Sequence, residues 1–195
     1  MRILAVADEE SKYLYDYYRP GKLDGFDLII AAGDLSVEYL EFLVTMADCP
    51  LVYIHGNHDE NQKRVPTGCI CADDKLVEVN GLRILGFGGS YKYRDGKYMY
   101  TEKQMNSRVK GFSSQLKKSH GFDILLTHAP AFGLNDLEDL PHRGFDCFNT
   151  LLDTYEPAYF IHGHVHRNYG YRIPQKTQKG KTTVINAFDY CVFDI

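Results

Sequence analysis

The stretch LVYIHGNHD, residues 51–59, decides the fold class of this chain. It joins a nearly continuous apolar run, Leu51–His55, to the polar sequence Gly56-Asn57-His58-Asp59. Apolar runs of this length are typical of strands that are covered on both faces in α/β proteins. Polar residues after such a strand lie at its carboxyl end, where open α/β sheets form their ligand-binding crevice. The stretch therefore predicts an α/β fold with a functional site directly after this strand.

Four other apolar runs end in polar residues of the same kinds. Arg2–Ala7 precedes Asp8, Phe26–Ala32 precedes Gly33-Asp34, Phe122–Thr127 precedes His128, and Tyr159–His162 precedes Gly163-His164-Val165-His166. Taken singly, an aspartate or histidine after a strand is more often a helix cap, a turn or a surface residue. Because the carboxyl ends of parallel strands meet at one edge of a sheet, we expect these side chains in one crevice. Their shared position indicates a metal centre.

The segments between and after these runs carry further signals of an α/β chain. Ser36 caps an amphipathic stretch, Thr101-x-x-Gln104 is a capping-box pattern that starts a helix lasting to Gly121, and a third apolar face follows Phe145. Leu82–Gly86 predicts another strand, residues 86–100 predict a long loop, and Tyr169–Ile173, Thr182–Asn186 and Cys191–Phe193 predict short antiparallel strands. No repeat or linker divides the sequence, which predicts one domain over residues 1–195.

Composition excludes several function classes. Hydrophobic residues form 44% and charged residues 25% of the 195 residues, a globular balance that argues against disorder and coiled coil. A net charge of −4 gives no basic field for nucleic acid, so nucleic acid is not the expected partner. No apolar run reaches the ~20 residues of a membrane span, and the start lacks a leader pattern, so we expect a cytoplasmic protein without membrane contact. Five scattered cysteines predict reduced thiols.

The donor types narrow the chemistry of the expected centre. Imidazole with carboxylate suits Zn, Mn, Fe or Ni, whereas the lack of paired thiolates argues against a structural zinc site. The donors outnumber the ligands that one ion normally takes, which favours two ions that share a bridging carboxylate. Two ions ~3.5–4 Å apart hold the attacking and leaving oxygens of a displacement at phosphorus.

The ordered series Asp8, Gly33-Asp34, Gly56-Asn57-His58-Asp59, His128 and Gly163-His164-Val165-His166 resembles the calcineurin-like metallophosphoesterase superfamily. The resemblance extends from residue 8 to residue 166, and the combination of motifs in this order is highly specific. It implies a four-layer α/β/β/α sandwich of two mixed β-sheets flanked by helices.

The resemblance also implies a role for each matching residue. Asp34 would bridge two divalent metals, Asp8 and His166 would hold the first, and Asn57, His128 and His164 would hold the second. His58 would face the phosphate as an acid or transition-state stabiliser. Asp59 is expected to orient His58, with a helix N-cap as the alternative.

Glu10 departs from the family pattern, which opens with Asp-x-His where this chain has Asp8-Glu9-Glu10. A carboxylate in place of the histidine shifts metal preference toward Mn, Fe or Mg and away from Zn. We expect Glu10 near the metal, directly or through water; in the alternative it points away and leaves the first site weak. The predicted cofactors are two divalent ions, Mn or Fe, with Zn, Ni and Mg as alternatives.

Two segments are candidates for substrate contact. Arg94 lies in the Gly- and Tyr-rich loop with Tyr91, and His142 opens the sequence His142-Arg143-Gly144 before a predicted helix whose start suits an anion. The alternative for both segments is a solvated loop. His55 and His162 are interpreted as structural residues.

These observations predict a metallophosphoesterase that cleaves a small phosphodiester or phosphomonoester by attack of a hydroxide held between two metals. Phosphodiesterase activity is favoured because short family members without cap domains often have it, which is analogy rather than residue evidence. Two alternatives stay open: a catalytically impaired scaffold of the same fold that binds proteins, and a metal-dependent nuclease. The sequence leaves the oligomeric state open.

Overall fold

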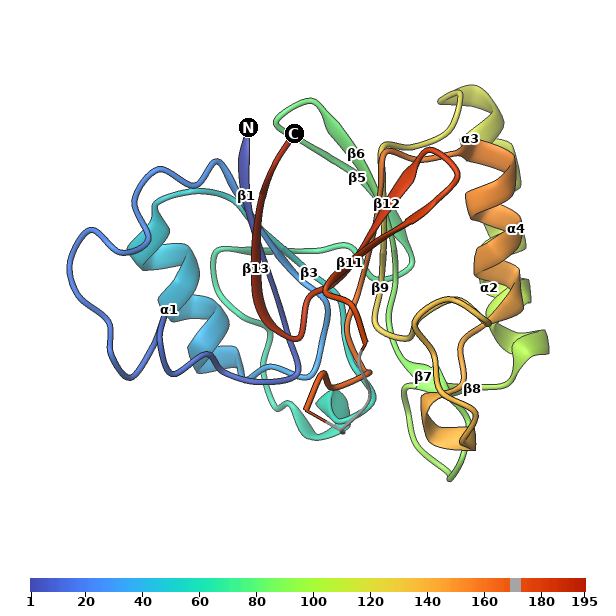
Figure 1. Cartoon of the computed structure of the whole chain (residues 1–195), viewed down its shortest axis with the longest axis horizontal. Coiled ribbons are helices and arrows are strands. Elements are labelled where there is room, and N and C mark those ends of the chain that lie inside the picture. The colour runs from blue at the N-terminus through green and yellow to red at the C-terminus, as the bar shows by residue number, and fades with distance from the viewer. Residues whose placement is uncertain (169–172) are drawn as a thin grey trace.

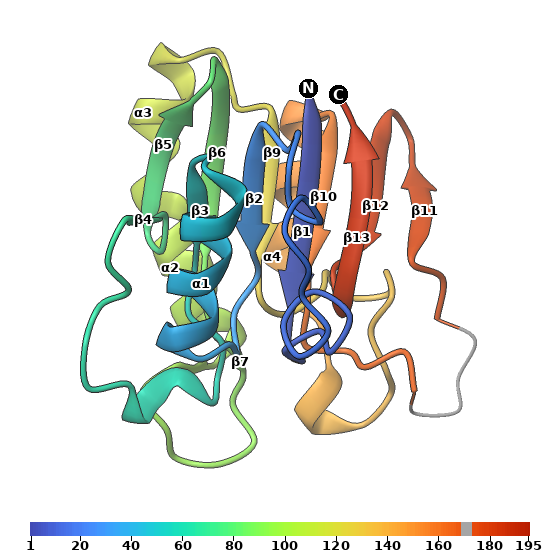
Figure 2. The same ribbon diagram turned by 90° about the vertical axis from the view of Figure 1, so that its left-hand side faces the viewer.

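Two mixed β-sheets pack face to face, and helices cover their outer faces (Figures 1 and 2). The computed structural model describes residues 1–168 and 173–195. The resulting helix–sheet–sheet–helix order is the four-layer α/β arrangement expected from the sequence.

The first sheet has five strands in the order β13-β1-β2-β3-β4. Its strands are β1 (Arg2–Ala7), β2 (Leu28–Ala31), β3 (Leu51–Tyr53), β4 (Cys69–Cys71) and β13 (Asp189–Asp194). The strands β1 to β4 run parallel, and β13 joins β1 in antiparallel register, with Ile3 opposite Phe193.

The second sheet has six strands in the order β11-β12-β10-β9-β6-β5. Its strands are β5 (Lys75–Val79), β6 (Leu82–Phe87), β9 (Ile124–Thr127), β10 (Tyr159–His162), β11 (Lys176–Lys179) and β12 (Thr182–Asn186). The central strands β12, β10, β9 and β6 are parallel, whereas β11 and β5 form antiparallel edges. The carboxyl ends of β9 and β10 therefore lie side by side.

Helix α1 (Val37–Ala47) covers the outer face of the first sheet, and α2 (Glu102–Gly111), α3 (Ser113–Lys118) and α4 (Asp146–Tyr155) cover the second (Figure 1). The predicted caps are confirmed: the Ser36 side chain accepts from the amide of Tyr39, and Thr101 with Gln104 forms a complete capping box. No helix among residues 1–168 and 173–195 combines the length and apolar content that crossing a bilayer requires.

Strand alternation divides the apolar residues among three layers of core. Ile3, Ala5 and Ala7 of β1 face the second sheet, whereas Leu4 and Val6 face helix α1. Both sets are fully buried, because each sheet is covered on both faces. A third cluster, with Phe87, Phe148 and Phe160, lies beneath α2 and α4.

Several predicted boundaries differ from the structure. The helix expected to reach Gly121 divides at Phe112, whose amide bonds to the carbonyl of Val109 in a tighter turn while its ring packs edge-on against Phe87. The expected loop over residues 86–100 contains two short parallel strands, β7 (Ser90–Tyr91) and β8 (Met99–Tyr100). The sequence analysis missed β4, β5 and β11. The strand predicted at residues 169–173 falls on residues 169–172, which lie outside the described part of the chain.

Candidate metal centre

The predicted polar side chains do meet where strands of both sheets end. Asp8 follows β1 and Asp34 follows β2 in one sheet, while His128 follows β9 in the other. The ligand atoms of these three residues all lie within 4.8 Å of one another. The meeting point of the two sheets thus brings together residues that are up to 120 positions apart in the sequence, from 8 to 128.

Strained backbone turns direct three of these side chains into the crevice. Asp8, Asp34 and His164 have φ of 66°, 57° and 67°, in the left-handed region that side chains other than glycine rarely adopt. Such conformations cost roughly 1–3 kcal/mol each, persist only where the surroundings enforce them, and cluster at functional sites. Positive φ also occurs elsewhere in the chain, so it is the meeting of three such residues at one point that is consistent with a site.

The glycines of the Gly-Asp, Gly-Asn and Gly-His pairs each permit a close approach to a site residue. A Cβ on Gly33 would lie 2.8 Å from Nδ1 of His128, and one on Gly163 would lie 2.7 Å from Oδ2 of Asp8. A Cβ on Gly56 would lie 2.5 Å from the amide nitrogen of Asp34 and would overlap its carboxylate. All three motifs therefore need glycine because their backbones pack directly against another motif's functional side chain.

His128 is oriented as a metal ligand would be. Its fully buried ring donates from Nδ1 to the carbonyl of Ala32 at 2.7 Å. Its Nε2 then faces Oδ1 of Asn57 at 3.0 Å and Oδ2 of Asp34 at 3.3 Å, two atoms that can only accept. Three lone-pair donors therefore converge on one point, which requires a cation between them.

The metal-free protein meets this requirement with a proton. Burial disfavours the imidazolium, but the Asp34 and Asp8 carboxylates outweigh it and raise the pKa of His128 to about 9. Asn57 turns its oxygen to the site although its buried Nδ2 finds no partner among the described residues. An amide that points its oxygen inward at the cost of an unpaired nitrogen fits a metal ion at this point.

The Asp8 and Asp34 carboxylates give the centre more negative charge than its protein groups neutralise. Burial raises the pKa of Asp8 to about 7, with the Asp34 charge adding to the rise. Burial also opposes ionisation of Asp34, yet the His128 imidazolium lowers the pKa of Asp34 to about 2. Since Asp8 holds its charge only weakly beside Asp34, a divalent cation would stabilise both carboxylates.

His164 and His166 complete the ring of donors. His164 donates from its amide to both oxygens of Asp8, at 3.0 and 2.8 Å, and from Nε2 to the carbonyl of Pro141 at 2.7 Å, which leaves Nδ1 as the acceptor. Nε2 of His166 lies 3.8 Å from Oδ1 of Asp8. Burial lowers the pKa of both histidines, so both are neutral and able to bind a metal.

His58 lies at the open side of the centre. Its backbone amide donates to Oδ1 of Asp34 at 2.7 Å, and its exposed side chain lines a hollow of about 300 Å3 together with Asp34. The imidazole therefore stands in solvent beside the carboxylate that is expected to bridge the metals.

Asp59 braces the loops rather than the His58 ring. Its buried carboxylate accepts from the amides of Asp34 at 3.0 Å and Gly56 at 2.7 Å, and from Nε2 of Gln62 at 2.7 Å. The hydrogen bond to His58 expected from the sequence is not among its bonds in the described part of the chain. The physical reason is that the tight turn after β3 points this carboxylate back at two backbone amides. Gln62 was missed from the sequence because it lies outside every motif.

Glu10 lies outside the cluster formed by Asp8, Asp34 and His128. His166, the other residue expected at the first metal, also lies outside this cluster, so Glu10 as a ligand of that metal stays a prediction.

The two candidates for substrate contact differ in position. Arg94 pairs with Glu60 at 3.1 Å, so its charge is already compensated. His142 bonds to Asp139 at 2.7 Å, and its ring centroid lies 5.3 Å from that of His164, at the rim of the centre. The interpretation of His55 and His162 as structural agrees with their partners, Asp73 at 2.9 Å and Asn135 at 3.2 Å.

Comparisons with known proteins show which family and which fold this chain resembles. A family model described as calcineurin-like phosphoesterase matches residues 1–168. The human metallophosphoesterase domain-containing protein 1 is 27% identical over 138 residues, which are 66% of this chain and 37% of that protein, so the chain spans little more than a third of that relative. A UPF0046 protein of Caenorhabditis elegans is 28% identical over 248 residues, covering 100% of this chain and 81% of that protein.

Solved structures share the fold at low identity. The crystal structure of TT1561 of Thermus thermophilus has a TM-score of 0.61 at 15% identity and covers 96% of this chain and 89% of its own. Plasmodium GAP50, described as an anchor in the inner membrane complex, has a TM-score of 0.52 at 11% identity, with 95% and 70% covered. At these identities the likeness concerns the fold alone.

Proposed function

We propose a function from one premise: this chain belongs to the calcineurin-like phosphoesterase family, whose members hydrolyse phosphate esters with metal ions. The proposal is that the chain hydrolyses a small phosphodiester, and phosphomonoesters less well, at a centre of two divalent ions. Manganese or iron is the proposed metal, because carboxylate and amide oxygens stand beside the imidazoles.

The observation that carries the proposal is the convergence on Nε2 of His128. Asp34 Oδ2 and Asn57 Oδ1 approach that nitrogen at 3.3 and 3.0 Å, and none of the three atoms carries a proton in the neutral state. In this proposal Asp8, Asp34 and His166 would hold one ion, and Asp34, Asn57, His128 and His164 would hold the other. Divalent cations bound there would supply an activated water and positive charge opposite the phosphoryl oxygens.

The chain's own residues supply the rest of the chemistry. The His58 imidazole, beside Asp34 and open to solvent, donates a proton to the leaving oxygen or stabilises its developing charge, a contribution of ~10²–10⁴ in rate. Asp59 contributes by positioning, because it holds the amides of Asp34 and Gly56. The carbonyls of Ala32 and Pro141 fix which nitrogen of His128 and His164 faces the ions.

The test uses protein stripped with chelator and reloaded with Mn, Ni or Zn. Hydrolysis of bis(4-nitrophenyl) phosphate should exceed that of 4-nitrophenyl phosphate and should depend on added metal. His58→Ala should lose at least ~10² in kcat while it keeps the wild-type metal content. His120→Asn is the matched control, since His120 is exposed at the end of α3 with φ of 54°, which asparagine tolerates.

Three outcomes would contradict the proposal. Metal binding without hydrolysis of either ester would favour the scaffold alternative, and unchanged activity in His58→Ala would remove its proposed role. Cleavage of single-stranded or duplex DNA at rates above those of the small diester would favour the nuclease alternative.

A further inference from the structure

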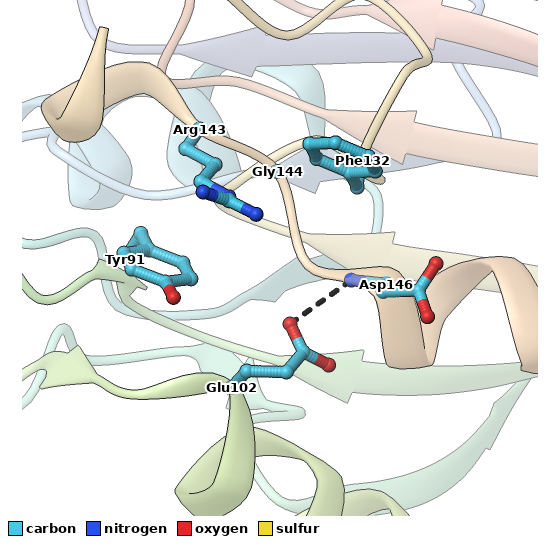
Figure 3. Close-up of a pocket in the computed structure, with 6 residues that line it drawn as sticks. All are labelled: Tyr91, Glu102, Phe132, Arg143, Gly144 and Asp146. Carbon is cyan, nitrogen blue, oxygen red and sulfur yellow. Dashed lines mark hydrogen bonds between the residues drawn. The ribbon is translucent and has the colours of Figure 1, made fainter. Parts of the chain in front are cut away.

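A second pocket, drawn in Figure 3, is separate from the hollow that His58 lines. It has a volume of about 350 Å3 and is lined by Tyr91, Glu102, Phe132, Arg143, Gly144 and Asp146. Its walls come from β7, from the start of α2 and from the segment between β9 and α4. The pocket is large enough for one substituent of a phosphate ester.

Arg143 is held at this pocket by two aromatic rings. Its guanidinium carbon lies 4.9 Å from the ring centroid of Phe132 and 5.5 Å from that of Tyr91. Figure 3 shows the guanidinium between these two rings. No carboxylate or carbonyl within residues 1–168 and 173–195 accepts from Arg143, so the N–H groups at the edge of the guanidinium face solvent and the pocket. A guanidinium whose faces are covered by aromatic rings and whose N–H groups are open suits an oxyanion, because oxyanions accept from these N–H groups in the plane of the guanidinium.

The neighbouring acidic groups do not neutralise Arg143. Glu102 accepts from the amides of Asp146 at 3.0 Å and Cys147 at 2.9 Å, so both of its oxygens are used at the start of α4. The Asp146 carboxylate points away from Arg143 in Figure 3. This arrangement corrects the expectation that the helix start binds an anion, because Glu102 already occupies its first amides. The positive charge available in this pocket is that of Arg143.

The backbone that carries Arg143 and Phe132 is fixed by close packing. Phe132 donates its amide to the carbonyl of Phe145 at 3.2 Å, and Phe145 donates to Pro130 at 3.1 Å. A Cβ on Gly144 would lie 2.5 Å from the amide nitrogen of Phe132, so only glycine permits this approach. The side chains that form the pocket therefore have little freedom to separate.

The same segment touches the metal centre. Pro141 accepts from Nε2 of His164, and His142 packs its ring against that of His164. Arg143 is the next residue along the chain. The pocket residue Arg143 and the contacts to His164 therefore belong to one short segment of chain.

We propose that Arg143 is a specificity-determining residue that binds a second oxyanion, carried on a planar ester group of the substrate. The inference rests on the proposed function for its catalytic context. The preferred substrate class is then a phosphate diester with a carboxylate or phosphate on the group that enters the pocket, and the exposed face of Phe132, 46% exposed, packs against that planar group. Arg94, the candidate drawn from the sequence, pairs with Glu60 and does not line this pocket.

The experiment compares two diesters that release the same 4-nitrophenolate: bis(4-nitrophenyl) phosphate and 4-carboxyphenyl 4-nitrophenyl phosphate. Arg143→Ala should lose about tenfold in kcat/KM for the carboxylated diester and less than twofold for the other. Arg143→Lys should recover part of the loss, because it keeps the charge without the planar fork. Arg19→Ala, an exposed arginine in the loop after β1, is the control and should change neither substrate.

A binding measurement separates this inference from the proposed function. The Nε–H resonance of Arg143 is followed by NMR while 4-carboxyphenyl phosphate is added to metal-free protein, and a saturable shift is expected. If no metal supports hydrolysis, the proposed function is wrong. The NMR titration still shows whether Arg143 binds an anion, because it uses metal-free protein. Equal losses on both diesters in Arg143→Ala, or a resonance that does not respond to the ligand, would overturn the inference. Addition of free benzoate should not accelerate the nitrophenyl diester; acceleration would mean that the pocket binds a separate anion instead.

Discussion

Replacing Gly56 by alanine tests the geometry of the centre without removing any proposed ligand. The new Cβ would lie 2.5 Å from the amide nitrogen of Asp34, against an ordinary contact of at least 3.4 Å, and would overlap the Asp34 carboxylate. The segment must therefore shift by about 1 Å. A displacement of ~1 Å costs on the order of 10²-fold in rate, and such overpacking costs ~1–3 kcal/mol in stability.

The assay for Gly56→Ala has two parts. Calorimetric titration with Mn²⁺ should show weakened binding, and kcat/KM on bis(4-nitrophenyl) phosphate should fall about a hundredfold. Gly111→Ala is the matched control, because nothing lies within 4 Å of a Cβ at that position. A Gly56→Ala protein with wild-type metal affinity and activity would refute the argument that the glycines of the three motifs exist to bring site residues together.

Two further predictions concern Asp73 and Glu10. Burial disfavours the charged form of Asp73, but the hydrogen bond from His55 and the charge of Arg108 hold the pKa of Asp73 below its ordinary value. The ionised Asp73 therefore stabilises the folded protein fully above ~pH 4, and this stabilisation is lost as the pH falls through the lower pKa of the folded state. Asp73→Ala should therefore lower the free energy of unfolding at pH 7 by ~3–5 kcal/mol. In urea titrations the difference from the wild type should shrink below ~pH 4. A difference that does not change with pH would contradict the link between the Asp73 charge and stability. Glu10→Gln tests whether Glu10 helps to hold the first ion: elemental analysis should show a lower metal content than in the wild type, and an unchanged content would mean that Glu10 points away from the metal.

The sequence predicted the location of the centre because the ends of buried strands can be predicted from where apolar runs end. β1, β10 and β12 begin and end at the predicted residues, and Asp8 follows the first of them directly. The short edge strand β4 and the charged edge β11 were missed because neither has an apolar run or clear alternation. Their residues are exposed or half-buried, so burial leaves little mark on their composition.

The orientation of the donors could not be predicted from the sequence. The carbonyls of Ala32 and Pro141 determine which nitrogen of His128 and His164 is free, and a backbone carbonyl has no sequence signature. For the same reason, the sequence indicated Arg94 for substrate contact, whereas the structure favours Arg143. Only the fold shows that Arg94 pairs with Glu60 and that two aromatic rings hold Arg143.

Diffraction from a crystal grown with Mn²⁺, recorded on both sides of the manganese absorption edge, tests the central claim most directly. The account predicts two anomalous peaks ~3.5–4 Å apart with the Asp34 carboxylate between them, one beside Asn57 and His128 and the other beside Asp8 and His166. A crystal saturated with Mn²⁺ that shows no anomalous peak between Asp34 and His128 would contradict it.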